Sequence, residues 1–180
     1  MATFICIASG PSLTADDCTL ARDSGHPIIA VNTSFKAIPD CQYIYAADFS
    51  WWEKHYREIQ TSAELWTSSV SAAIHHRLNF FSHPDNESFN SGQRAIQLAV
   101  QQGARRIILL GYDCDIEAGT HWHGDHPSAL KNPDNVSVSR WHVEFSRLVP
   151  LLDKVEILNC SRRSALTCFP ISTFETALYA

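Results

Sequence analysis

Residues 3–12 have the sequence Thr3-Phe4-Ile5-Cys6-Ile7-Ala8-Ser9-Gly10-Pro11-Ser12, an apolar run that ends in a polar turn. A short continuous apolar run is typical of a strand that is buried on both faces of a sheet. The next segment, Leu13 to Ser24, has the composition of a helix and is followed by Gly25. We therefore expect a strand–turn–helix unit near the amino terminus.

The same pattern recurs along the chain. We expect further strands over Pro27–Val31, Gln42–Ala47, Glu64–Ser68, Leu78–Phe81, Arg106–Leu110 and Val155–Leu158. We expect further helices over Trp51–Gln60, Ser91–Gly103, Ser139–Leu152 and Thr173–Leu178. Strands that alternate with helices predict an α/β fold, in which a mainly parallel sheet carries helices on both faces. Such sheets bind ligands beyond the carboxyl ends of their strands, so we expect a polar crevice there.

Length and composition narrow the class of protein. The chain has 180 residues, of which 45% are hydrophobic, so we expect one domain over residues 1–180. Its net charge of -5 predicts that it has no broad nucleic-acid-binding face. No apolar run reaches the roughly 18 residues of a membrane span, and residues 1–12 do not resemble a secretory signal, which predicts a cytoplasmic protein. The six cysteines form no CxxC pair and are expected to be free thiols.

A long loop from Cys114 to Ser137 contains three histidines and one aspartate within six positions, namely His121, His123, Asp125 and His126. Loops of this length in a compact domain are usually functional. Imidazole is both a common zinc ligand and the side chain that titrates nearest neutrality. The cluster therefore forms either a metal site or a catalytic base with its orienting partners.

The spacing HxHxDH matches the zinc motif of metallo-β-lactamase-type hydrolases. Those enzymes draw further ligands from well downstream, whereas His142 is the one histidine that follows the cluster here. Their motif also follows many β-hairpins, and this chain begins instead with a strand–turn–helix unit. A hydrolase with zinc held by His121, His123 and either Asp125 or His126 is therefore the alternative interpretation.

Other candidate residues follow the predicted strands or begin a helix. Gly10 allows a close approach of a phosphate or ribose to the backbone, or simply makes a turn before a Ser12 cap. Ser91-Gly92 offers N–H groups to a phosphate at a helix start, where a plain N-cap is the simpler explanation. Arg162 and Arg163 either add a basic rim to this crevice or are solvated charges. Neither a GxGxxG fingerprint nor a GxxxxGK[ST] phosphate loop is present.

Several segments together resemble a known framework. These are Phe4 to Leu13 with its Ser9-Gly10-Pro11-Ser12 turn, Val31-Asn32, Ser91-Gly92 with the helix to Gly103-Ala104, and Ile107 to Asp113. In this order they resemble the MptE-like proteins, which include the archaeal 6-hydroxymethylpterin pyrophosphokinases, and also the bacterial family 42 sialyltransferases. Many phage proteins share this framework, which implies a phage or prophage origin and a location in the host cytoplasm.

The resemblance implies a Rossmann-like sheet that binds a nucleotide or nucleotide-sugar donor. Ser9, Gly10, Pro11, Ser12, Asn32, Ser91, Gly92 and Asp113 would surround the donor. The sialyltransferases use a histidine in the loop after the strand that corresponds to Arg106–Leu110, so His126, or else His123 or His121, would be the general base. Those enzymes have Asn-Gly-Pro-Ser where this chain has Ser9-Gly10-Pro11-Ser12, so one amide contact to the nucleotide is missing.

The sequence therefore predicts a transferase that moves a glycosyl or diphosphate group onto a small-molecule or glycan acceptor. Asp125 or Asp113 would orient the basic imidazole, and a divalent metal, Mg²⁺ or Zn²⁺, is a candidate cofactor. A nucleotide-binding protein without catalysis is the third interpretation. Trp51-Trp52 and Tyr56 are candidates for an acceptor platform or for the contact of a homo-oligomer, although core packing is the simpler explanation for at least one of the tryptophans.

Overall fold

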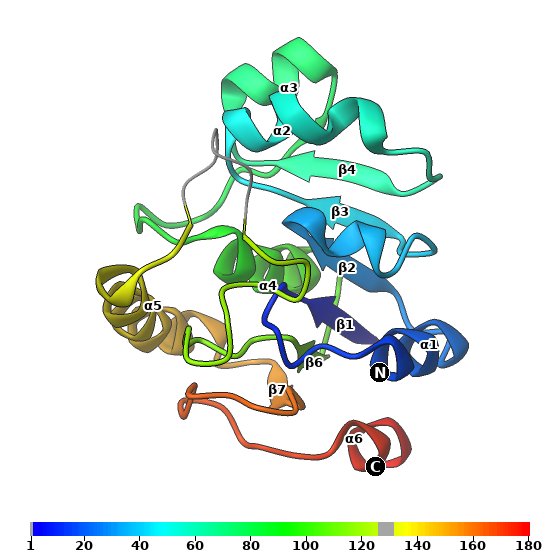
Figure 1. Cartoon of the computed structure of the whole chain (residues 1–180), viewed down its shortest axis with the longest axis vertical. Coiled ribbons are helices and arrows are strands. Elements are labelled where there is room, and N and C mark those ends of the chain that lie inside the picture. Colours follow the sequence, from blue (N-terminus) through cyan, green and yellow to red (C-terminus); the bar gives the residue numbers. More distant parts are fainter. Residues whose placement is uncertain (1, 126–131) are drawn as a thin grey trace.

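The computed structural model describes residues 2–125 and 132–180, and its centre is a seven-stranded sheet (Figure 1). The strands are β1 (Thr3–Ile7), β2 (Ile28–Val31), β3 (Tyr43–Tyr45), β4 (Glu64–Thr67), β5 (Asn79–Phe80), β6 (Arg106–Leu110) and β7 (Glu156–Asn159). Each neighbouring pair is parallel, and the order across the sheet is β5-β4-β3-β2-β1-β6-β7. This arrangement confirms the predicted Rossmann-like α/β fold.

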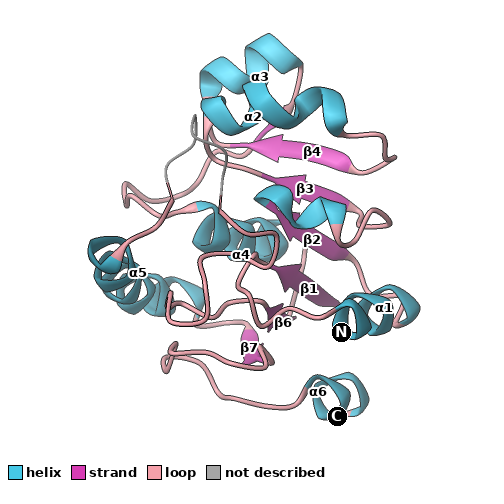
Figure 2. Cartoon of the chain, viewed as in Figure 1, coloured by secondary structure: helices cyan, strands magenta, loops and turns pink. Residues whose placement is uncertain are grey.

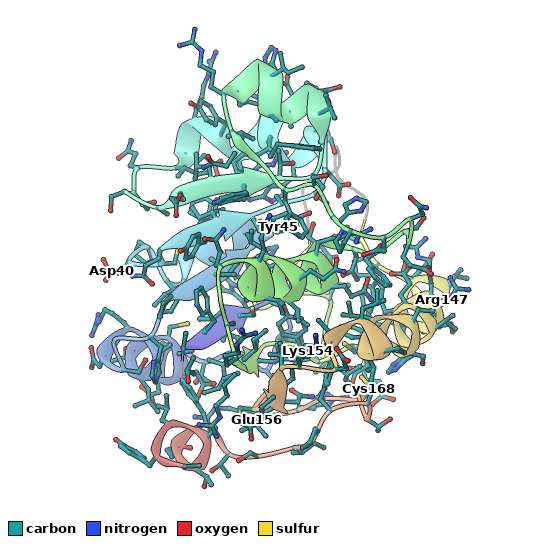
Figure 3. All side chains as sticks on the ribbon, turned by 180° about the vertical axis from the view of Figure 1, so that it is seen from behind. Asp40, Tyr45, Arg147, Lys154, Glu156 and Cys168 are labelled. Carbon is teal, nitrogen blue, oxygen red and sulfur yellow. The ribbon has the colours of Figure 1, made fainter. Side chains whose placement is uncertain are left out.

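Helices cover both faces of the sheet (Figure 2). They are α1 (Ala15–Asp23), α2 (Phe49–His55), α3 (Val70–His76), α4 (Ser91–Gln101), α5 (Asn135–Leu148) and α6 (Phe174–Tyr179), with 3₁₀ turns η1 (Asn32–Lys36), η2 (Tyr56–Glu58) and η3 (Val149–Leu152). Apolar side chains of α4 and α5 belong to one core cluster, and those of α1, α2, α3 and α6 belong to the other. Figure 3 shows the face that α4 and α5 cover.

Strand β1 explains why the opening run is apolar throughout. Phe4 and Cys6 point into the core beneath α4 and α5, whereas Ile5 and Ile7 point into the opposite core. Successive side chains of a strand alternate between the two faces, so a strand with both faces covered needs apolar residues at every position. The four side chains are at most 4% exposed, which confirms burial on both sides.

The chain order reverses at β1. From β1 the sheet grows through β2, β3, β4 and β5 in one direction, and β6 then pairs with the other side of β1. Ile5 therefore lies between Ile28 of β2 and Ile108 of β6. The crevice at such a reversal is where open α/β sheets bind ligands. The segments after β1 and β6 are thus expected to form the site.

Two helices differ from the sequence prediction. Helix α3 was not predicted, because its apolar residues Val70 and Ile74 are 59% and 75% exposed and form no core-facing stripe. Helix α5 begins at Asn135 rather than Ser139, because the Asp134 carboxylate accepts a hydrogen bond from the backbone N–H of Ser137. The predicted loop over residues 114–137 is therefore shorter at its carboxyl end.

Further expectations concern the chain as a whole. Within residues 2–125 and 132–180, no helix is long and apolar enough to cross a membrane. All six cysteines are free thiols, as expected. Trp51 and Trp52 are buried, so core packing is the correct interpretation for both. The single domain over residues 1–180 stays a prediction.

Candidate functional site

A cleft of about 480 Å³ lies where the chain order reverses. Its walls come from the segments that follow β1, β2, β3 and β6, from the start of α4, and from α5. Seven of the predicted site residues line it: Ser9, Gly10, Asn32, Ser91, Gly92, Asp113 and His121. Among the described residues, Pro11, Ser12, His123 and Asp125 lie outside this lining.

The turn after β1 is fixed by Asp113, which follows β6. The backbone N–H and hydroxyl of Ser12 donate to the two oxygens of the Asp113 carboxylate at 2.9 and 2.6 Å. Gly10 leaves the space that this carboxylate fills, since a Cβ there would lie 2.5 Å from Cγ of Asp113 and from the carbonyl oxygen of Gly111. Burial raises the pKa of Asp113, and the hydrogen bonds from Ser12 oppose that rise. Both oxygens of Asp113 therefore serve to shape the floor of the cleft.

Ser9 connects the same turn to the histidine loop. Its hydroxyl shares a hydrogen bond of 2.9 Å with Nδ1 of His121, and its carbonyl accepts a hydrogen bond of the same length from the backbone N–H of Trp122. The indole N–H of Trp122 donates to the Ser34 hydroxyl at 3.4 Å, and that hydroxyl donates to the carbonyl of Ala8. A single residue at the end of β1 thus positions the first histidine of the cluster in the wall of the cleft.

The other members of the cluster have different places. The ring of His123 stacks on His121 with centroids 4.8 Å apart and planes 9° apart. Asp125 is exposed and accepts a hydrogen bond from the Thr120 hydroxyl. His126, the base that the sequence favoured, lies outside the described residues. His126 is one of the two alternatives for the third zinc ligand, beside Asp125, and zinc binding by the cluster also stays a prediction.

Helix α4 presents its start to the cleft. The Asn90 side chain accepts from the backbone N–H of Gln93, and the Gln93 side chain accepts from the N–H of Asn90, which forms a reciprocal capping box. The Ser91 hydroxyl accepts a hydrogen bond of 3.0 Å from the N–H of Ala47, just after β3. The N-cap interpretation therefore holds for Asn90, and the hydroxyl of Ser91 joins the helix to the sheet. The partial positive charge of the helix start still faces the cleft.

Asn32 begins η1 directly after β2 and lines the cleft. Its φ of 52° lies in the left-handed region, which residues other than glycine rarely adopt. Strained backbone of this kind is concentrated at ligand sites.

The sequence analysis missed Arg140 and Glu144, which line the opposite wall from successive turns of α5. Nε of Arg140 lies 3.4 Å from Oε1 of Glu144, and the Glu144 side chain is 7% exposed. Burial raises the pKa of Glu144, against the opposing effect of Arg140 and of the Gln93 amide. Arg140 is the only arginine or lysine among the described lining residues. The available signal in the sequence is the position of Glu144, three residues after Trp141 and four before Leu148, which places it beside the apolar stripe of this helix.

Arg162 and Arg163, which the sequence suggested as a basic rim, form ion pairs with carboxylates of the protein. The guanidinium of Arg162 donates two hydrogen bonds of 2.9 Å to the carboxylate of Asp17 on α1. Arg163 pairs with Glu117 at 2.7 Å and lies 3.5 Å from Asp115. Neither arginine is among the described residues that line the cleft, so the basic rim stays a prediction for both, whereas Arg140 lines the cleft.

Cys114 also lines the cleft, and burial raises its pKa to about 12. The thiolate is the nucleophilic form of cysteine, so this thiol is essentially un-ionised at neutral pH. Among the described lining residues, the groups available for chemistry thus include one imidazole, several carboxyl groups, one guanidinium and backbone N–H groups.

The fold and the site define an α/β protein with a cleft at the carboxyl edge of a parallel sheet. No protein-family model matches the chain, and no characterised protein is significantly similar in sequence. Its fold is similar to that of the MAf glycosyltransferase from Magnetospirillum magneticum AMB-1, with a TM-score of 0.67 and 12% sequence identity over 95% of this chain. The chain spans about a third of that protein, since the match covers 33% of its length. At this identity the similarity shows the fold alone.

Proposed function

We propose that this chain is a glycosyltransferase that binds a nucleotide-sugar in the cleft and transfers the sugar to a hydroxyl acceptor. The observation that carries the proposal is the position of His121, which Ser9 holds in the cleft wall. The glycosyltransferase fold of the structural neighbour and the sequence resemblance to family 42 sialyltransferases support the same class of reaction. Diphosphate transfer, which the resemblance to MptE-like proteins suggests, uses a similar donor and is distinguished by its products.

In this mechanism the donor phosphates lie between the start of α4 and Arg140. The N–H groups of a helix start and a guanidinium both stabilise the negative charge that develops on a departing phosphate. The sugar then lies toward His121 and Glu144, whose carboxyl group can bind sugar hydroxyls. The acceptor is a small molecule or glycan that enters through the open side of the cleft.

His121 acts as the general base. In the proposed tautomer Nδ1–H of His121 donates to the Ser9 hydroxyl across the 2.9 Å contact, which leaves Nε2 as the basic nitrogen. Nε2 is buried in the structure, so the ring must move to expose this atom when the acceptor binds. The acceptor oxygen then forms a bond to the anomeric carbon while its proton moves to Nε2. The bond from that carbon to the phosphate oxygen breaks, and the nucleotide leaves with the electron pair. Ser9 is a positioning residue that selects the tautomer and orientation of the ring.

The first experiment is a thermal-shift screen against nucleotides, nucleotide-sugars and divalent metals. A ligand at about 100 times its dissociation constant stabilises the folded state by roughly 2.7 kcal/mol, which is readily measured. We then expect slow release of free nucleotide from the best nucleotide-sugar, with water in place of the acceptor. Failure of every nucleotide and nucleotide-sugar to stabilise the protein would contradict the proposal.

The second experiment compares three histidine variants in the nucleotide-release assay. His121→Ala is expected to lower the rate by about 10²–10⁴-fold while the donor still stabilises the fold. His123→Ala is the matched control, because His123 stacks on His121 and lies outside the lining of the cleft among the described residues. Full activity of His121→Ala together with loss in His126→Ala would assign the base to His126 instead. Activity that depends on stoichiometric zinc bound to the cluster would favour the hydrolase.

A further inference from the structure

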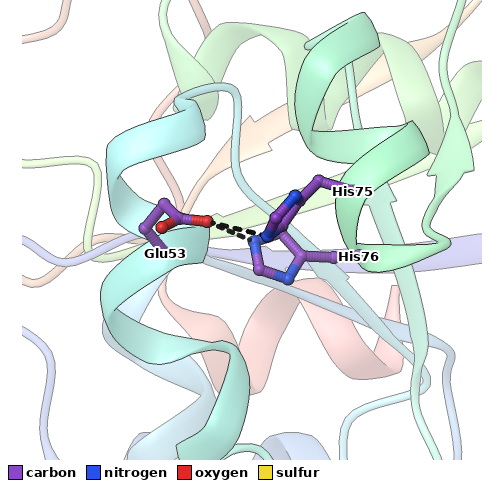
Figure 4. Close-up of side chains that lie close together, drawn as sticks. All are labelled: Glu53, His75 and His76. Atoms are coloured by element: carbon purple, nitrogen blue, oxygen red, sulfur yellow. Dashed lines mark hydrogen bonds and ion pairs between the residues drawn. The ribbon is translucent and has the colours of Figure 1, made fainter.

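A second group of metal-ligating side chains lies on the helices that cover the β3–β4 region of the sheet. Helices α2 and α3 lie next to each other there, and Glu53 of α2 faces the two consecutive histidines at the end of α3, His75 and His76 (Figures 1 and 4). Oε1 of Glu53 is 3.1 Å from Nε2 of His76 and 3.4 Å from Nε2 of His75. None of the three lines the cleft described above.

The spacing of these atoms fits a tetrahedral metal ion. One ligand atom from each side chain lies within 4.8 Å of the other two. Zinc binds imidazole nitrogen and carboxylate oxygen at about 2.0–2.2 Å in a tetrahedron, so neighbouring ligand atoms are about 3.3–3.5 Å apart. The separations from Glu53 to His76 and to His75, 3.1 and 3.4 Å, lie close to that edge length. Two of the three edges of the ligand set thus already have the length that zinc requires, and the third is at most 4.8 Å.

Aromatic contacts hold both imidazoles. Tyr56 lies against His76 with ring centroids 4.7 Å apart, and Phe49 packs edge-on against His75 at 5.8 Å. The two imidazoles also pack against each other at 4.6 Å and 80°. Fixed rings lose less conformational freedom on binding an ion. The side chain of His76 is 10% exposed, whereas those of His75 and Glu53 are 62% and 48% exposed, so the fourth position of a tetrahedron faces water.

We propose that Glu53, His75 and His76 form a zinc site that joins α2 to α3. Two imidazoles and one carboxylate are the ligands zinc prefers, and three protein ligands leave one position for an exchangeable water. Each helix has seven residues, and helices so short depend on tertiary contacts for their stability. The ion adds such a contact. This site is independent of the function proposed for the cleft.

The test is a Zn²⁺ titration of the full chain, purified without a histidine tag, stripped with a chelator, and measured by competition with a chromophoric chelator. The parent for the titration is His121→Ala/His123→Ala/His126→Ala, which removes the imidazoles of the loop cluster. We expect this parent to bind one zinc ion. We expect Glu53→Gln and His75→Ala in that background to weaken binding at least 100-fold, since changes to residues that only support ligands cost about 10–100-fold.

Two matched controls make the result specific. His26→Ala removes a histidine outside the group and Glu64→Gln neutralises a carboxylate at the start of β4, and both are expected to leave zinc affinity unchanged. Co²⁺ gives a second measurement, because a tetrahedral cobalt site absorbs strongly in the visible range, and this absorbance is expected to disappear in Glu53→Gln. A parent that binds no zinc overturns the proposal. So do Glu53→Gln and His75→Ala variants that bind zinc as tightly as the parent.

Discussion

Replacement of Gly10 by alanine tests the central contact of the cleft. The φ of Gly10 lies outside the left-handed region, so an alanine costs no backbone strain there. Its Cβ would, however, lie 2.5 Å from Cγ of Asp113 and from the carbonyl oxygen of Gly111, and closer still to Oδ1 of Asp113. The Asp113 side chain must therefore move away from Ser12.

The expected loss follows from the two hydrogen bonds that this movement breaks. Ser12 donates to Asp113 from its backbone N–H at 2.9 Å and from its hydroxyl at 2.6 Å. A hydrogen bond to a charged group contributes about 1.5–3 kcal/mol, so Gly10→Ala is expected to lower the free energy of unfolding by about 3–6 kcal/mol. Small domains are stable by about 5–15 kcal/mol in all, so the effect is large.

Urea unfolding followed by tryptophan fluorescence measures this loss, because Trp51 and Trp52 are buried. Gly25→Ala is the matched control, since Gly25 has a φ of 74° and no atom within 4 Å of the added Cβ. It is expected to cost about 1–2 kcal/mol from backbone strain alone. If Gly10→Ala is no more destabilising than Gly25→Ala, the argument from close contact is refuted.

Two further predictions concern carboxyl groups whose pKa is shifted. Asp85→Ala removes the partner of the buried Arg94, whose guanidinium lies 2.9 Å from the Asp85 carboxylate. In urea unfolding at neutral pH this change is expected to lower the free energy of unfolding by about 3–5 kcal/mol. The control Asp23→Ala removes an exposed carboxylate and is expected to lower it little. Burial raises the pKa of Asp85, but hydrogen bonds from Gln97, the Glu87 N–H and Arg94 together hold this pKa below its ordinary value. The stabilisation by the Asp85 carboxylate is therefore present above the ordinary pKa and is lost as the pH falls through the lowered pKa. Equal costs at neutral and strongly acidic pH would contradict this. For Glu144 the sign is opposite: burial raises its pKa, so its contribution to stability falls as the pH rises from the ordinary value through the raised one. Glu144→Gln is expected to abolish this fall in a series of unfolding measurements across that range, and an unchanged series would show that the Glu144 carboxyl group does not cause it.

The sheet could be predicted because each inner strand is recognisable from its own residues and from those next to it in the sequence. Each inner strand is a short apolar run, and the polar residue after it marks the edge where the cleft lies, as for Asn32 after β2 and Asp113 after β6. Helix α3 was missed because its exposed Val70 and Ile74 give no amphipathic pattern.

The partners within the site could not be predicted, because they are distant in sequence. Ser9 and His121 are 112 positions apart, and Arg162 and Asp17 are 145 apart. Nothing in the local sequence shows that Ser9 orients a histidine, or that Arg162 pairs with α1 rather than with a ligand. Those contacts follow from the order of strands across the sheet, which places β6 beside β1 and β7 beside β6.

The pairing of β1 also sets the order in which this protein can fold. Ile5 meets Ile28 early in the chain, but its other neighbour, Ile108, is synthesised much later. Until β6 arrives, one side of β1 is an open strand edge with apolar residues on both faces, which is a surface prone to aggregate. On the ribosome, the strands from β1 to β5 are therefore made before β6 and form an incomplete sheet with an exposed edge. The pairing of β6 with β1 closes that edge and brings together the segments that form the cleft, so both occur in the same late step.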